Sequence, residues 1–143
     1  MKDQSGRGMA EKQLNLKIPS TFDELDRAVE TLQEFIPGLD LDDDLAYRVI
    51  LLASEALTNA LEHGNQWDVK KEATLKLVRD SDKIELTVTD QGDGIHWTQR
   101  DPLSEENRLA DHGRGQYFMQ KMADEVHIDQ ENCKVCLIFY HQT

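Results

Sequence analysis

Apolar residues recur at regular intervals along most of this chain, and their spacing predicts where strands and helices lie. Residues 12–18 alternate apolar with polar side chains and stop at Pro19, which is typical of a half-buried strand. Residues 21–36 begin with the spacing of a capping box and then repeat apolar side chains at helical intervals as far as Pro37. The first two elements are therefore predicted to be a strand and an amphipathic helix.

A long helix and two alternating strands are predicted next. The aspartates at positions 42–44 favour a helix N-terminus, and an apolar stripe then continues to Gly64. Alternation over residues 73–77 and 84–88 indicates a β-hairpin whose second strand ends at Asp90. The remaining predictions are a long excursion over residues 91–113, a helix over 117–123, and strands over 126–128 and 135–140.

This order of elements predicts an α+β fold, a two-layer α/β sandwich in which a mixed, mostly antiparallel sheet carries helices on one face. Residues 1–11 are polar and offer almost nothing to bury, so we expect them to form a flexible tail. Residues 12–143 have the length of a single domain, which can bury most of the surface that its unfolded chain exposes.

The charge balance excludes some classes of partner. The 143 residues carry a formal charge of -12, so most of the surface repels phosphate backbones and anionic membranes. No stretch is apolar over the roughly 18 to 20 residues that a bilayer requires, and the first residues lack the hydrophobic run of a signal peptide. We expect a cytoplasmic protein without direct nucleic-acid or membrane binding, although solubility alone also favours an acidic surface.

The two cysteines favour neither a metal site nor a disulfide. Cys133 and Cys136 lie in a strand-like run, where an offset of three places their side chains on opposite faces. We therefore expect both to be core thiols.

Three polar residues of the long helix share a spacing of four. Glu55, Asn59 and His63 would lie on one helical face, which combines a carboxylate, an amide oxygen and an imidazole. The amide of Asn59 can offer its oxygen to a hard divalent ion such as magnesium, and Glu55 can accept a proton from an attacking hydroxyl. Either residue alone is equally typical of the solvent face of an amphipathic helix.

Two glycine clusters follow at the ends of predicted elements. Asp90 ends a strand and precedes Gly92 and Gly94, so its carboxylate can accept hydrogen bonds from a base edge while the glycines leave room beside it. The run Gly113-Arg114-Gly115 opens a helix, where free backbone N–H groups attract phosphate. Each cluster alone is also typical of an ordinary turn or helix start, and neither has the surroundings of a Walker or dinucleotide-binding motif.

The three blocks together, in this order, resemble the GHKL superfamily of ATPases and within it the anti-sigma-factor serine/threonine kinases. The similarity extends over roughly residues 12–140. The sequences that carry it are Ser-Glu-Ala-Leu-Thr-Asn-Ala from Ser54 with His-Gly-Asn from His63, Val-Thr-Asp-Gln-Gly-Asp-Gly from Val88, and Gly-Arg-Gly from Gly113.

This resemblance implies a fold, two ligands, two partners and a role for each matching residue. The fold is the Bergerat-type ATP-binding sandwich, and the ligands are ATP and magnesium. Asn59 would bind the metal, Glu55 would be the catalytic base, and Asp90 would bond the adenine amino group. The other implied nucleotide contacts are His63, Gly92, Gly94, Gly113, Arg114, Gly115 and Cys133.

The family phosphorylates a serine of a STAS-domain antagonist and holds a sigma factor inactive when that antagonist is unavailable. The resemblance therefore implies an ATP-driven partner switch in transcription control, and a homodimer is a further possibility. Glu62 stands where the family often has lysine, and Cys133 stands where it has a threonine that is a better hydrogen-bond donor.

Two other functions stay open on sequence alone. A binding module that senses nucleotide and sequesters a partner without catalysis is favoured by Glu62 and Cys133, and the intact Glu55 argues against it. The ATP-binding half of a histidine kinase is disfavoured, since the chain has no separate phosphoacceptor hairpin. Trp67 and Trp97 are each compatible with a partner anchor, a core residue or a pocket wall.

Overall fold

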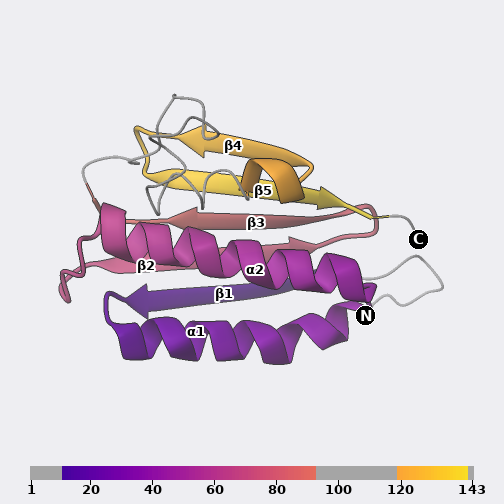
Figure 1. The fold of residues 1–143 in the computed structure, drawn as a ribbon, viewed down its shortest axis with the longest axis horizontal. Helices are drawn as coiled ribbons and strands as arrows, with labels where there is room; N and C mark the ends of the chain where they lie inside the picture. Colours follow the sequence, from indigo (N-terminus) through magenta and orange to yellow (C-terminus); the bar gives the residue numbers. More distant parts are fainter. Residues whose placement is uncertain (1–10, 93–118, 142–143) are drawn as a thin grey trace.

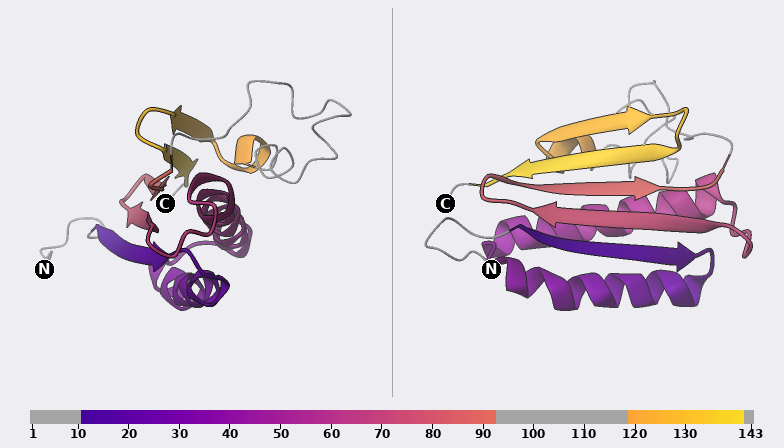
Figure 2. Two further views of the ribbon diagram at one scale, coloured as in Figure 1. Left: turned by 90° about the vertical axis from the view of Figure 1, so that its left-hand side faces the viewer. Right: turned by 180° about the vertical axis from the view of Figure 1, so that it is seen from behind.

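The computed structural model describes residues 11–92 and 119–141. These residues form two layers, a five-stranded sheet and two long helices that cover one of its faces (Figure 1, Figure 2). The strands are β1 (Lys12–Pro19), β2 (Glu72–Arg79), β3 (Lys83–Thr89), β4 (Glu125–Asp129) and β5 (Lys134–Tyr140). The helices are α1 (Phe22–Phe35) and α2 (Asp43–Asn59), each followed by a short helical turn, η1 (Ile36–Leu39) and η2 (Ala60–Gly64).

The predicted elements are confirmed, with ends that differ by a few residues. Strand β1 runs one residue further than predicted because Pro19 still pairs with Glu72. Both helix starts are capped by side chains, as the sequence indicates: Thr21 Oγ1 accepts from Glu24 N at 3.1 Å, and Asp42 Oδ1 accepts from Leu45 N at 2.8 Å. Of the helix predicted over 117–123, residues 119–122 are described, and they are helical.

The sheet has the order β1-β2-β3-β5-β4. All four strand pairs among the described residues are antiparallel, so the expected mixture of parallel and antiparallel pairs is absent from this part of the chain. The hairpins β2–β3 and β4–β5 each join neighbouring strands, and β5 inserts between β3 and β4. The expectation of an α+β sandwich with helices on one face is confirmed.

The core lies between the helices and the sheet. Alternate residues of each strand point toward the helices, and helix α2 supplies an apolar stripe that meets them. The largest side chains that are almost fully buried are Leu32, Leu39, Leu52, Leu57, Leu61, Leu75, Leu77, Ile84, Leu86, Met119, Leu137 and Phe139.

The two cysteines differ from the prediction. Cys133, expected in a strand-like run, lies in the turn before β5 with a φ of 55°, and β5 begins at Lys134, one residue before the predicted start. Its side chain is buried as expected. Cys136 is only partly buried, on the sheet face opposite the helices, and burial raises the pKa of its thiol. Cys133 and Cys136 are not joined by a disulfide.

In the part of the chain that the structure describes, no helix is long and apolar enough to cross a bilayer.

Candidate functional site

The C-terminal end of α2 widens into a π-turn, η2. There Asn65 N donates to Ala60 O at 2.8 Å, an i to i−5 bond that replaces the α-helical pattern. Glu55, Asn59 and His63 were predicted to lie on one face of an α-helix. Glu55 and Asn59 do so, since both lie within α2, whereas His63 lies in the wider π-turn and is not aligned with them by the α-helical repeat. Such turns occur most often at functional sites, and this one brings Gly64 against the end of β3.

The π-turn and the residues after β3 meet at Gly64, Asp90 and Gly92. A Cβ atom on Gly64 would lie 2.6 Å from Oδ1 of Asp90 and closer still to its other carboxyl atoms. A Cβ atom on Gly92 would lie 2.7 Å from the carbonyl carbon of Gly64 and closer to the carbonyl oxygen. Gly64 is therefore required by the close approach of the Asp90 carboxylate, and Gly92 by the close approach of the Gly64 backbone.

Asp90 is held at this junction from two sides. Its Oδ1 accepts from Gly92 N at 2.8 Å, which folds the chain back around the carboxylate. Its backbone N donates to Cys133 O at 3.0 Å, and Cys133 Sγ donates to Gly92 O at 3.3 Å. The turn before β5 thus closes the junction, and the residues predicted to bind a nucleotide base lie next to one another.

Asn65 connects this junction to two more segments, a role that the sequence analysis did not assign. Its Oδ1 accepts from Gln91 N at 2.8 Å, and its Nδ2 donates to Ser20 Oγ at 3.1 Å. Ser20 Oγ in turn donates to Lys71 O at 2.7 Å. Asn65 and Ser20 are both almost fully buried. A polar residue directly after the predicted helix end was the only sequence signal, and such residues are common.

Asn59 carries the one buried side-chain polar atom without a hydrogen-bond partner in the part of the chain described, its Nδ2. A buried NH2 group without an acceptor costs about 1–3 kcal/mol, so it calls for an explanation, and a bound ligand that offers an acceptor oxygen, such as a phosphate, is one. The described residues contain no group of three His, Cys, Asp or Glu side chains placed to hold a metal ion. A divalent ion at Asn59 would therefore take most of its ligands from phosphate oxygens and water, which suits magnesium carried by a nucleotide.

Four predicted contacts, Gly94, Gly113, Arg114 and Gly115, lie outside the described residues. The segment that leads away from them is anchored: Arg48 of α2 donates from Nη1 to Met122 O at 2.8 Å and from Nε to Asp44 Oδ2 at 3.0 Å. Helix α2 therefore positions the short helix that follows the second glycine cluster.

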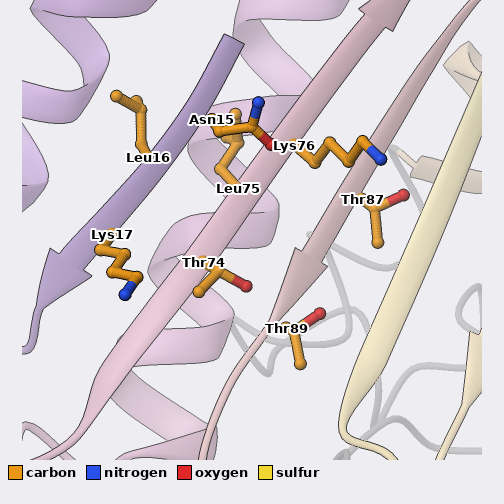
Figure 3. Close-up of a pocket in the computed structure, with 8 residues that line it drawn as sticks. All are labelled: Asn15, Leu16, Lys17, Thr74, Leu75, Lys76, Thr87 and Thr89. Carbon is orange, nitrogen blue, oxygen red and sulfur yellow. The ribbon is translucent and has the colours of Figure 1, made fainter. Parts of the chain in front are cut away.

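A separate hollow of about 540 Å³ lies on the other face of the sheet (Figure 3). Cross-strand pairing places its polar side chains in two adjacent rows over β1, β2 and β3, with the helices behind the sheet. Its lining residues are Asn15, Leu16, Lys17, Thr74, Leu75, Lys76, Thr87 and Thr89. The sheet separates this hollow from α2, so it does not belong to the junction around Asp90.

Comparisons with known proteins agree with this architecture. The family described as "Histidine kinase-like ATPase domain" matches residues 18–140. The serine-protein kinase RsbW of Bacillus subtilis is 28% identical over 89 residues, 57% of this chain and 56% of that protein, so this chain spans just over half its length. An anti-sigma F factor of Geobacillus stearothermophilus is 31% identical over 104 residues, which are 71% of each chain.

A solved structure has the same fold. It contains the RsbU and RsbW domains of a Mycobacterium tuberculosis protein, and it superposes with a TM-score of 0.60 over 92% of this chain and 32% of that one. The sequence identity is 18%, so this likeness supports the arrangement of helices and strands alone.

Proposed function

Since the chain belongs to the histidine kinase-like ATPase family, among the anti-sigma-factor kinases, we propose that it binds MgATP and phosphorylates a serine of a STAS-type anti-sigma antagonist. The observation that carries this proposal is the junction of Gly64, Asp90 and Gly92 beside α2. This junction fixes the position of the Asp90 carboxylate, because no side chain at Gly64 or Gly92 could fit between the two segments. The unsatisfied amide of Asn59 lies on the helix that leads into the same junction.

Each residue at the site has a proposed role. Asp90 accepts a hydrogen bond from the adenine amino group, and Cys133 and His63 complete the surroundings of the nucleotide. Gly94, Gly113, Arg114 and Gly115 are proposed to contact the nucleotide, with the second cluster holding its phosphates. Asn59 contributes its amide oxygen to magnesium, which when bound neutralises charge on the phosphate oxygens.

Glu55 is proposed to be the general base. The serine hydroxyl of the antagonist attacks the γ-phosphorus, its proton passes to the Glu55 carboxylate, and ADP leaves with the electrons of the broken bond. Glu55 lies one helical turn before Asn59, so the proposed base and the proposed metal ligand lie on the same face of α2.

The proposed biological role is a partner switch. The unphosphorylated antagonist and a sigma factor would compete for this protein, and phosphorylation of the antagonist would leave it free to hold the sigma factor. Control of transcription by this route takes place in the cytoplasm, where we propose that the protein acts as a homodimer.

Calorimetric titration of ATP tests the nucleotide site. We expect binding that depends on magnesium in the wild-type protein and loses most of that dependence in Asn59→Ala. Asn132→Ala is the matched control, since this asparagine lies exposed in the turn before β5. Absence of ATP binding to the wild-type protein would exclude the kinase and leave a partner-binding module without nucleotide.

Phosphotransfer tests the catalytic role. Glu55→Ala should bind MgATP and fail to phosphorylate the STAS antagonists encoded by the same genome, whereas Glu131→Ala, which removes an exposed carboxylate far along the chain, should transfer normally. Transfer by Glu55→Ala at the wild-type rate would show that another group takes the proton. ATP binding without transfer by the wild-type protein would favour the nucleotide-sensing module.

A further inference from the structure

Two aromatic side chains stack on each other at the surface, and only one of them, Phe22, is largely exposed. The rings of Phe22, at the start of α1, and Trp67, after η2, stack with centroids 4.2 Å apart and an interplanar angle of 29°. Phe22 remains 67% exposed, and so does Val69, two residues after Trp67. We call Phe22, Trp67 and Val69 the aromatic patch. Large apolar side chains gathered at the surface often mark an interaction site, and aromatic residues are enriched at the centres of interfaces.

The backbone under the aromatic patch is held in an unfavourable conformation. Gln66 and Trp67 have φ values of 54° and 56°, in the left-handed region that side chains other than glycine rarely occupy. Each such residue costs on the order of 1 kcal/mol or more. Trp67 N donates to Leu61 O at 2.9 Å, and Asp68 N donates to Asn65 O at 3.0 Å, so the loop is locked in place. The half-buried indole therefore packs against the core on one side and supports the exposed ring of Phe22 on the other.

An acidic stripe continues from the patch along α1. Asp23, Asp26, Glu30 and Glu34 are all exposed and are spaced by three, four and four residues, which places them along one side of the helix. Phe22 and Asp26 are four apart and so lie on the same side. The only basic residue of α1, Arg27, pairs with Glu24 at 3.5 Å and does not neutralise the stripe. We call these four carboxylates the α1 stripe.

The patch is connected to the junction around Asp90. The loop that carries Trp67 begins at Asn65, which bonds both Gln91 N and Ser20 Oγ, and Ser20 directly precedes the N-cap of α1. The same buried asparagine therefore holds the residue after Asp90, the start of α1 and the Trp67 loop. A protein bound at the patch would lie beside the proposed nucleotide site.

We propose that the aromatic patch and the α1 stripe form the docking surface for a basic segment of the sequestered sigma factor. This inference rests on the proposed function. An apolar side chain of that segment packs on Phe22 and Trp67, and its lysines or arginines follow the carboxylates along α1. A like-charged row at helical spacing is unfavourable in the free protein, so a basic partner gains from neutralising it. The same charge repels nucleic acids and anionic membranes.

The probes are the purified sigma factors encoded by the same genome, titrated calorimetrically into the full chain with MgATP. Phe22→Ala should weaken binding about tenfold or more, as expected for an interface anchor. The double variant Asp26→Lys with Glu30→Lys should weaken it similarly and should reduce the salt dependence seen with the wild-type protein. Both variants should keep wild-type ATP affinity. The charge variant should also keep the wild-type melting temperature, whereas Phe22→Ala should lower it slightly because the ring contact with Trp67 is lost.

Two matched controls separate this surface from general effects. Tyr47→Ala removes an aromatic side chain that is 62% exposed on α2, and Glu131→Lys reverses an exposed charge in the turn before β5. Both should bind the sigma factor as the wild-type protein does. Wild-type affinity in Phe22→Ala and in the double charge variant would overturn the docking surface while leaving the proposed function intact.

Two further outcomes also decide the question. Loss of a homodimer in Phe22→Ala, measured by light scattering, would assign the patch to a second copy of this chain and overturn the proposal. If no sigma factor binds the wild-type protein, the proposed function itself fails, and the docking surface fails with it.

Discussion

Replacement of Gly92 by alanine tests whether the contact between the π-turn and the end of β3 builds the site. The new Cβ would lie 2.7 Å from the carbonyl carbon of Gly64 and closer to the carbonyl oxygen, whereas ordinary contacts begin near 3.4 Å. Neither atom belongs to a flexible side chain, so the two backbone segments must move apart by more than an ångström to reach an ordinary contact. Overpacking of this kind costs about 1–3 kcal/mol.

The same displacement separates Asp90 from Gly64 and breaks the pocket wall. We expect Gly92→Ala to lower the melting temperature by about 4 °C for each kcal/mol, as is usual for a domain of this length. ATP affinity should fall by a larger factor than stability alone explains, because the backbone beside the carboxylate has shifted.

Gly38→Ala is the matched control, since a Cβ atom at Gly38 meets nothing within 4 Å. Urea denaturation gives the stability of each variant, and calorimetry gives its nucleotide affinity under conditions where both are folded. If Gly92→Ala matches Gly38→Ala in both measurements, the close approach of the two segments does not shape the site, and the reasoning is wrong.

Three further predictions follow from side chains whose partners are defined. The pKa of Asp80 lies below its usual value because Asp82 N donates to its carboxylate. The stabilisation from this ionised carboxylate is complete above the unfolded pKa of 3.8 and is lost as the pH falls through the lower folded pKa. The free energy of unfolding of the wild-type protein, minus that of Asp80→Asn, should therefore decrease on acidification. Asn65→Ala should cost about 1–3 kcal/mol in urea denaturation, because it leaves the N–H of Gln91 without an acceptor and removes the donor to the buried Ser20 hydroxyl, and a cost near zero would contradict this. Burial raises the pKa of Cys136, so iodoacetamide should modify it more slowly at neutral pH than it modifies a free thiol, with a rate that increases with pH in peptide mass spectrometry.

The sequence predicted the elements well because each depends on a short-range pattern. Alternation along β1 and the caps at Thr21 and Asp42 are local signals, and the structure confirms them within a residue or two. The glycine after Asp90 was a local signal of the same kind, and the structure places Gly92 against the backbone of Gly64, where no side chain fits.

What the sequence did not predict depends on contacts between distant segments. The π-turn at the end of α2 has no pattern of its own, and it changes the alignment of His63 with Glu55. The left-handed residue at Cys133 ends a run that otherwise looks like continuous strand. The role of Asn65 arises only when three separate segments meet, so no local periodicity could indicate it.

The hydrogen bonds around Asn65 also bear on the order in which the protein folds. They join residues that are 45 and 26 positions apart, and the bond from Ser20 to Lys71 spans 51. Such contacts form only after long loops have closed, whereas α2 and the β2–β3 hairpin need only local contacts. We therefore expect the site to assemble late, so that Asn65→Ala speeds unfolding and leaves the folding rate nearly unchanged. The residues around Asp90 would then be among the last to acquire protection from hydrogen exchange as the chain folds.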